Sequence, residues 1–374
     1  MNRLSEIDFL RGIAVILVML SHHWLFDLTQ RVGWVGVDLF FVLSGYLVSG
    51  LLFSEYKKFD NIKPIHFLIR RGFKIYPLFY FSIIFSVIIF VGFYYTNENR
   101  GILRAFIPEL IFMQNYYSGY WGHHWSLAVE EHFYIFLTIL IYLLIKQKIL
   151  NNYKFFLLIA IFIFVGCLSL RFYAFNYQPS RFKFGETHLR IDSLFAGVLI
   201  AYFYNFKHDQ LKEFYHKYKP FIIALTFLPL FFIPFLNIFD SGFLKIYGFS
   251  LLYIAFGSLL LVFLFTPEIG KKLEKVCSKR LYTIITGIGF YSYSIYLFHN
   301  YYNQYINNYA YTDVIPDRVM STRIFVDFIA FFVVSITLGI VLSKLIEIPF
   351  LKLRDKYFPR RQKDVVLSDR QENI

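Results

Sequence analysis

The chain has 374 residues, of which 57% are hydrophobic and only 17% are charged, and its mean hydropathy is +0.51. Soluble domains contain about 25% charged residues, so this composition excludes a water-soluble enzyme and indicates a protein with many membrane spans. The net charge of +13 would suit a nucleic-acid-binding protein unless the positions of the charges explain it otherwise. The two cysteines, Cys167 and Cys277, give no disulfide framework.

Apolar runs of about 20 residues predict ten membrane-spanning helices, and therefore an all-α bundle with both termini on one side. The predicted spans run roughly 8–26, 34–53, 75–95, 125–146, 154–171, 190–206, 220–238, 243–265, 284–303 and 323–346. We expect residues 1–350 to form the membrane domain and residues 351–374 a basic cytoplasmic tail. The apolar piece 102–114 is too short to span, which favours an interfacial or re-entrant helix.

The lysines and arginines indicate the orientation of the bundle. The loops 54–74, 146–154, 207–219 and 266–283, together with the two chain ends, hold 27 of the 38 cationic residues. Cytoplasmic loops are enriched in lysine and arginine, so we expect both termini in the cytosol and the protein in the inner (plasma) membrane. Because topology accounts for most of the net charge, nucleic acid is not an expected partner.

The first predicted span contains several ionisable residues. Arg11 and His22 are eleven residues apart, so their side chains lie within about 20° of each other around a helix, about 16 Å apart along it. Ionisable groups inside a membrane helix are costly and usually mark a functional interior. A neutral imidazole at His22 could remove a proton from a hydroxyl, whereas His23 points about 100° away. The alternative is that both residues make only structural contacts between helices.

The second span and the loop after it add further polar residues. Asp38 lies about one turn inside the second span, where it could orient a histidine or pair with an arginine. Arg70, Arg71 and Lys74 cluster at the entrance to the third span, where they could bind the phosphates of an anionic donor. A basic cytoplasmic loop also arises for topological reasons alone.

Two glutamates and a serine stand at the outer entrance to the fourth span. Ser126 and Glu130 are four residues apart and share a helix face, while Glu131 should point elsewhere. A carboxylate here would lie at the depth expected for His22. A zinc site is conceivable because histidines are common ligands, but adjacent histidines on a helix diverge, so we expect no metal. The histidines considered for that site are His22, His23, His123 and His124.

Together these segments resemble acyltransferase family 3, the integral-membrane acyltransferases that modify glycans and related acceptors. Each motif is weak by itself, but seven in register with ten spans are specific and cover nearly the whole chain. They are 8–12 with Arg11 and His22, 36–45, 70–77, 125–131, 190–192, His299 and 347–349.

The resemblance implies acyl transfer from cytosolic acyl-CoA, commonly acetyl-CoA, to a hydroxyl of a glycan at the outer face. It makes His22 the expected catalytic residue. The family's Arg-x-x-Arg motif falls on Arg71 and Lys74, and the lysine keeps the charge without the bidentate fork. Many relatives carry an extra outer hydrolase-like domain. Because this chain ends soon after its tenth predicted span, we expect it to act alone, as a homodimer, or with a separate outer-face transferase.

The hypothesis from the sequence is a membrane-bound O-acyltransferase with residues in three roles. For catalysis we expect His22, with Glu130 or Asp38 orienting it, and His23 or Glu131 as substitutes for these residues. For the donor we expect Arg11, Arg70, Arg71 and Lys74, and for the acceptor Trp125, Ser126, Arg190, Asp192 and His299.

Three alternatives stay open at this stage. Transfer could pass through an acyl-histidine intermediate. The intramembrane charges would also suit a transporter of a lipid-linked saccharide or small polar solute, although no paired halves with broken helices are visible. Finally, the acceptor could be a cytosolic small molecule.

Overall fold

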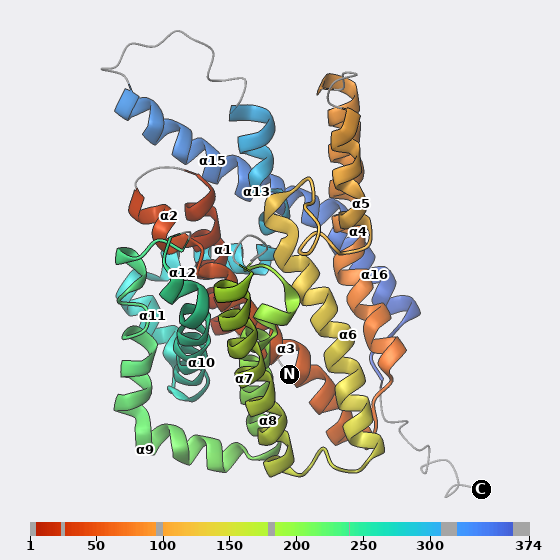
Figure 1. The fold of residues 1–374 in the computed structure, drawn as a ribbon, viewed down its shortest axis with the longest axis vertical. Coiled ribbons are helices and arrows are strands. Elements are labelled where there is room, and N and C mark those ends of the chain that lie inside the picture. The colour runs from red at the N-terminus through yellow and green to blue at the C-terminus, as the bar shows by residue number, and fades with distance from the viewer. Residues whose placement is uncertain are drawn as a thin grey trace, which may run out of the picture.

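A computed structural model describes residues 5–23, 27–94, 100–178, 184–238, 240–307 and 320–361 (Figure 1). Throughout these residues the regular structure is helical, with no strand. Six helices are long and apolar enough to cross a membrane, and one bent pair would make a seventh. The all-α, multi-pass architecture is therefore confirmed, whereas the count of ten spans and the side of the termini are not.

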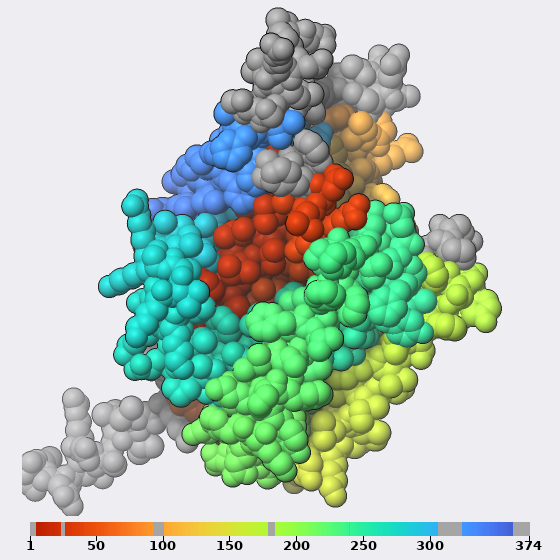
Figure 2. Space-filling model, turned by 90° about the vertical axis from the view of Figure 1, so that its left-hand side faces the viewer, coloured from red at the N-terminus to blue at the C-terminus, as the bar shows by residue number. Residues whose placement is uncertain are grey.

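The principal helices, in chain order, are α1 (Ser5–His22), α2 (Asp27–Gly33), α3 (Gly36–Phe59), α4 (Pro64–Ile89), α5 (Phe106–Leu110), α6 (Trp125–Lys146), α7 (Tyr153–Tyr177), α8 (Thr187–Phe206), α9 (His208–Phe227), α10 (Phe249–Phe265), α11 (Ile269–Cys277), α12 (Lys279–Phe290), α13 (Ser292–Tyr301), α15 (Met320–Leu342) and α16 (Ile348–Tyr357). In Figure 1 the C-terminal ends of α3, α6 and α8 lead into three of the basic loops at one end of the molecule. In Figure 2, α1 and α2, in red, lie between the green segment and the cyan and blue C-terminal part.

Two predicted spans are interrupted in the structure. The run 220–238 was expected to be one helix, but α9 begins earlier, kinks at Tyr218 before Pro220, and ends at Phe227. The run 284–303 is split into α12 and α13, which bend by 79° at the break. The bend lets α12 lie along α1 while α13 packs against α15. Hydropathy does not register such a bend, because both halves remain apolar.

The helix of the predicted tenth span continues beyond its expected end. After α15 the helix proceeds through a π-helical segment, Ser343–Glu347, into α16, which reaches Tyr357. Of the predicted tail, residues 362–374 lie outside the described residues. Because α16 packs against α4, the C-terminal helix lies beside the basic loop that precedes the third predicted span.

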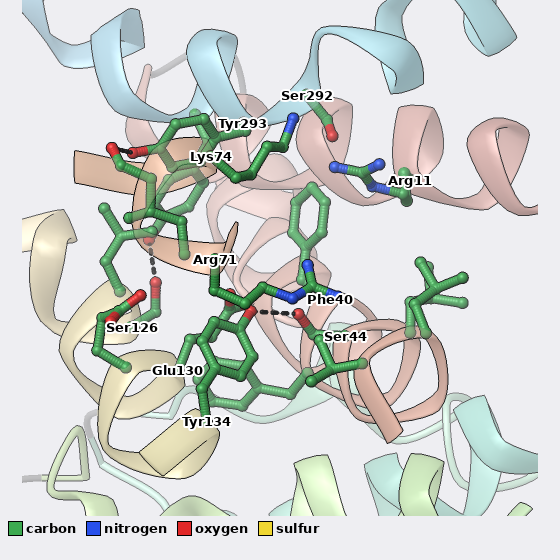
Figure 3. A pocket seen from close by; sticks show the side chains of 18 of the residues that line it. Arg11, Phe40, Ser44, Arg71, Lys74, Ser126, Glu130, Tyr134, Ser292 and Tyr293 are labelled. Carbon is green, nitrogen blue, oxygen red and sulfur yellow. Dashed lines mark hydrogen bonds between the residues drawn. The ribbon is translucent and has the colours of Figure 1, made fainter. Parts of the chain in front are cut away.

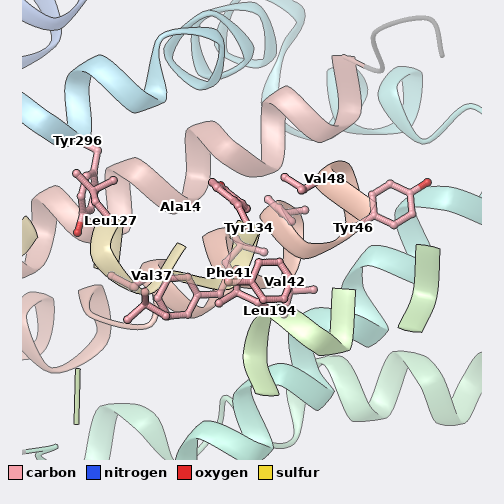
Figure 4. Close-up of a cluster of buried hydrophobic side chains, with 14 of the residues drawn as sticks. Ala14, Val37, Phe41, Val42, Tyr46, Val48, Leu127, Tyr134, Leu194 and Tyr296 are labelled. Carbon is pink, nitrogen blue, oxygen red and sulfur yellow. The ribbon is translucent and has the colours of Figure 1, made fainter. Parts of the chain in front are cut away.

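A close helix crossing joins α3 to α8. A Cβ on Gly45 would lie 1.9 Å from the Leu194 carbonyl oxygen, and one on Gly197 would lie 2.0 Å from that of Val42. Small residues permit this approach, which is the common way for membrane helices to pack. Figure 4 shows the buried cluster beside the crossing, in which Phe41, Val42 and Leu194 interdigitate. The crossing fixes the position of α3, from which all three cavities described below receive side chains.

We predict that Gly45→Ala destabilises the protein by about 1–3 kcal/mol, because the added methyl group overlaps the backbone of α8. The measurement is the fraction of protein that stays monodisperse in detergent after heating. Gly50→Ala on the same helix is the control, since no atom lies within 4 Å of the position of its added Cβ. Equal heat resistance of the two variants would show that the α3–α8 crossing is looser than described.

Candidate functional site

Three cavities follow one another through the helix bundle. We call them the basic cavity, of about 520 Å³, the central cavity, of about 140 Å³, and the histidine cavity, of about 500 Å³. Arg71 and Lys74 line both the basic and the central cavity. Val37 lines both the central and the histidine cavity. The shared residues show that the central cavity lies between the other two.

The basic cavity is surrounded by cationic side chains from two distant parts of the chain. Glu55 is the carboxylate among its described lining residues. Its cations are Lys58, Arg70, Arg71, Lys74, Arg354, Arg360 and Arg361. The sequence predicted a cluster from Arg70 to Lys74, but it assigned the three C-terminal arginines to a tail. The packing of α16 against α4 brings them together.

The three predicted donor-binding cations of α4 have different partners. Arg70 donates to Asp355 at 3.0 Å and to the carbonyl oxygen of Phe358. Lys74 forms an ion pair with Glu347. Arg71 instead lies over the rings of Phe67 and Tyr134, 5.5 and 5.7 Å from their centroids.

Within the described residues no ion pair occupies Arg71. Arg71 is therefore the cation of the three that keeps its hydrogen-bonding capacity for a ligand.

The central cavity contains a chain of hydrogen-bonded hydroxyl and carboxyl groups (Figure 3). Tyr134 contacts Ser44 at 2.9 Å and donates to Glu130 at 2.5 Å. Across the cavity Ser126 and Tyr296 are 2.6 Å apart. Arg11, which forms an ion pair with Asp8 at 3.8 Å, also lines this space.

The structure corrects two expectations about the glutamates of α6. Glu131 was expected to point elsewhere, but it lines the central cavity with Glu130 and accepts a hydrogen bond from Tyr76 at 3.0 Å. Glu130 was expected beside His22, but the two residues line different cavities. Glu130 lies instead with Arg11 and Arg71 around the central cavity.

His22 lies in the wall of the histidine cavity. Its Nδ1 is 2.8 Å from the carbonyl oxygen of Val18 and 3.1 Å from the hydroxyl of Ser21. A carbonyl oxygen can only accept, so Nδ1 carries the proton and Nε2 keeps a lone pair in the neutral ring. Backbone geometry thereby sets the tautomer that a general base requires.

Two further histidines pack behind His22. The ring centroids of His22 and His299 are 4.8 Å apart, and those of His22 and His123 are 6.1 Å apart. His299 is fully buried and lines none of the three cavities, so it contacts the candidate base rather than the cavity, where it was expected to bind substrate. The described residues contain no group of histidine, cysteine or acidic side chains that could hold a metal ion.

His23 has a different environment from His22. Its Nε2 is 3.1 Å from a carboxylate oxygen of Asp327, its Nδ1 is 2.8 Å from Asn303, and its ring stacks on Phe331. These contacts connect the residue after α1 to the π-helical segment Tyr302–Asn307, which follows α13, and to α15. The expected divergence of the two adjacent histidines is therefore present, and His23 has a structural setting.

The histidine cavity combines aromatic side chains with polar ones. Its aromatic lining consists of Trp34, Trp125, Phe184 and Phe249. Its polar lining consists of Ser21, His22, Asp27, Gln30, Arg31, Asp38, Arg190 and Asn237. Of the residues expected to bind the acceptor, Trp125 and Arg190 lie here, whereas Ser126 lines the central cavity.

Two buried ion pairs hold α8 in place. Arg190 donates to Asp38 on α3 at 2.7 Å, and Arg171 on α7 contacts Asp192 at 2.8 Å. Asp38 thus takes the second of its two expected roles, pairing with an arginine. Asp192, expected to bind substrate, lines none of the three cavities. Arg171 was not predicted as a functional or structural residue, although a cation at the end of an apolar run often marks a polar contact between helices.

Comparisons with known proteins find similar chains among O-acetyltransferases. A chain from Staphylococcus aureus (strain MRSA252), provisionally named an O-acetyltransferase, is 28% identical over 96% of this chain and 60% of its own length. The peptidoglycan O-acetyltransferase OatA of Listeria monocytogenes is 32% identical over 54% of this chain and 34% of its own. The O-acetyltransferase OatA of Staphylococcus aureus (strain NCTC 8325) is 30% identical over 53% of this chain.

This chain spans at most 60% of the length of these relatives. No solved structure matches it. The family model described as an acyltransferase domain matches residues 4–346, which include the residues from Arg11 to His299 that line or support the three cavities. The resemblance seen in the sequence is confirmed, and the chain belongs to acyltransferase family 3.

Proposed function

We propose that this protein is an O-acetyltransferase that moves an acyl group from cytosolic acyl-CoA, most simply acetyl-CoA, to a hydroxyl of a cell-envelope glycan on the outer face. The observation that carries the proposal is the series of three cavities, with a cationic chamber at one end and His22 at the other. Such a path connects an anionic donor to an acceptor without either crossing the bilayer. The names of the matched relatives support O-acetylation.

The basic cavity fits the phosphate-rich part of coenzyme A. Its seven cationic side chains face one carboxylate among the described lining residues, a balance that favours a polyanion. Guanidinium groups bind phosphate in bidentate fashion, and Arg71 has its fork available. The enrichment of lysine and arginine in the loops at this end supports its placement in the cytosol and the protein in the plasma membrane. The acyl-bearing arm would then enter the central cavity.

The chemistry is ester formation at the end near His22. Nε2 of His22 takes the proton of the acceptor hydroxyl. The oxygen of that hydroxyl attacks the thioester carbonyl carbon at the same time. The new C–O bond forms, the C–S bond breaks, and the thiolate of coenzyme A takes up a proton. The products are an acylated glycan and free coenzyme A. The aromatic walls of the histidine cavity, with polar groups between them, suit the faces and hydroxyls of a sugar ring.

The proposed partners are the glycan acceptor and the lipid bilayer. The acceptor is a glycan at the outer face, received in the histidine cavity directly. A separate outer-face transferase, or a second copy of this chain, would act only if the final acceptor is too large to enter that cavity. The lipid bilayer surrounds the apolar helices, whose large hydrophobic side chains are widely exposed.

We predict that His22→Ala lowers acyl transfer by about 10²–10⁴-fold, because it removes the general base. The measurement is mass spectrometry of envelope glycans from cells that produce the wild-type protein, the variant or neither. An added acetyl group that depends on the wild-type protein supports the function.

The adjacent histidine is the matched control. His23→Ala should keep its transfer rate per folded molecule but lower heat resistance, because Asp327 loses its partner. Undiminished acetylation by His22→Ala would refute the catalytic assignment. Glycans that are identical with and without the wild-type protein would refute the proposed function.

We predict that Arg71→Ala weakens binding of acetyl-CoA by about 1.5–3 kcal/mol, the usual contribution of a hydrogen bond to a charged group. Calorimetry in detergent measures the dissociation constant. The loss of affinity should be smaller for acetyl-pantetheine, which lacks the nucleotide and its phosphates. Lys272→Ala is the control, since Lys272 is an exposed cation of α11 and lines none of the three cavities. If Arg71→Ala and the wild type bind acetyl-CoA with equal affinity, Arg71 does not bind the donor, and the basic loop reflects membrane topology alone.

A further inference from the structure

One side chain separates the central cavity from the histidine cavity. Val37, in the first turn of α3, is 8% exposed, and it is the single residue common to the described linings of both cavities. The central cavity is also the smallest of the series by volume, about 140 Å³ against about 500 and 520 Å³. The central and the histidine cavity adjoin at Val37, whose side chain forms part of the wall of each.

The backbone at this point is held from two sides. Asp38, the next residue, is tied to Arg190 by the buried ion pair at 2.7 Å. Gly36, the preceding residue, lies so close to α1 that a Cβ on it would be 2.4 Å from the carbonyl oxygen of Ala14. The main chain cannot recede in either direction to enlarge the opening. The space where the two cavities adjoin therefore depends on the size of the side chain at position 37.

We infer that Val37 is a specificity-determining residue that limits the length of the acyl group able to pass from the central cavity to His22. This inference rests on the proposed function, because it requires an acyl donor in the central cavity and an acceptor near His22. A two-carbon acyl group passes beside the valine methyl groups. Each further methylene of a longer acyl chain must fit into the same space, where the fixed backbone gives no room.

The test uses purified protein in nanodiscs, where both faces of the membrane are accessible. The donors are radiolabelled acetyl-CoA and butanoyl-CoA, and the acceptor is a preparation of soluble peptidoglycan fragments. Val37→Ala should raise the ratio of kcat/KM for butanoyl-CoA to that for acetyl-CoA by about tenfold, the lower range for a change in hydrophobic pocket size. Val37→Phe should lower transfer from both donors while calorimetry shows unchanged affinity for coenzyme A.

Val42→Ala is the matched control for the loss of two methyl groups. Val42 lies on the same helix and is fully buried, but it lines none of the three cavities, so the donor ratio of this variant should equal that of the wild type. Wild-type transfer with an unchanged ratio in Val37→Ala would overturn this inference and leave the proposed function standing. Absence of wild-type transfer from either donor would overturn both.

Discussion

The ion pair between Asp38 and Arg190 is the interaction on which the arrangement of the site depends. Both side chains are buried between α3 and α8, where an unpaired charge would cost several kcal/mol. The Arg190 guanidinium also lies over the Phe249 ring, 3.8 Å from its centroid, and over Trp125 at 5.2 Å. One cation thereby fixes the depth of α3 against α8 and orients two aromatic walls of the histidine cavity.

The second buried pair shows which part of this arrangement is architectural. Arg171 and Asp192 have similar burial and a similar distance, 2.8 Å, and they too attach α8 to a neighbouring helix. Arg171 also donates to the carbonyl oxygens of Leu189 and Ile246 and to the Ser250 hydroxyl, so its hydrogen bonds join α7 to α8 and to the start of α10. Neither side chain of this pair lines the three cavities. The Asp38–Arg190 pair differs from the Arg171–Asp192 pair because its side chains line the histidine cavity as well as joining two helices.

The sequence predicted local features well and the relations between distant segments poorly. Apolar length located α6 at its observed bounds and the start of α3 close to Gly36, because a membrane helix must satisfy its own backbone hydrogen bonds, but it ended the second span at 53 whereas α3 reaches Phe59. Helical geometry alone also separated His22 from His23. It could not predict that Asp38 pairs with Arg190, which is 152 residues away. That choice depends on the crossing of α3 and α8, which a single sequence does not encode in any local pattern.

The same limit explains the errors in the site. Arg11 and His22 lie on one helix as expected, and they line successive cavities rather than one. Glu130 was matched to His22 by depth alone, and depth does not say on which side of a wall a side chain lies. From the sequence, the three C-terminal arginines were assigned to a basic cytoplasmic tail, because no local pattern indicated that they pack beside α4.

The cations of α4 have two kinds of environment: two of them make structural ion pairs, and the third lines two cavities. Arg70 and Lys74 bind Asp355 and Glu347, so they attach α4 to the C-terminal helices. These contacts hold the C-terminal arginines over the cavity and leave Arg71 between the basic and the central cavity. From there α1 runs from Arg11 to His22, a rise of about 16 Å. In the proposed reaction, a donor bound at Arg71 and an acceptor near His22 would lie toward opposite ends of α1, with Val37 of α3 where the central and histidine cavities adjoin.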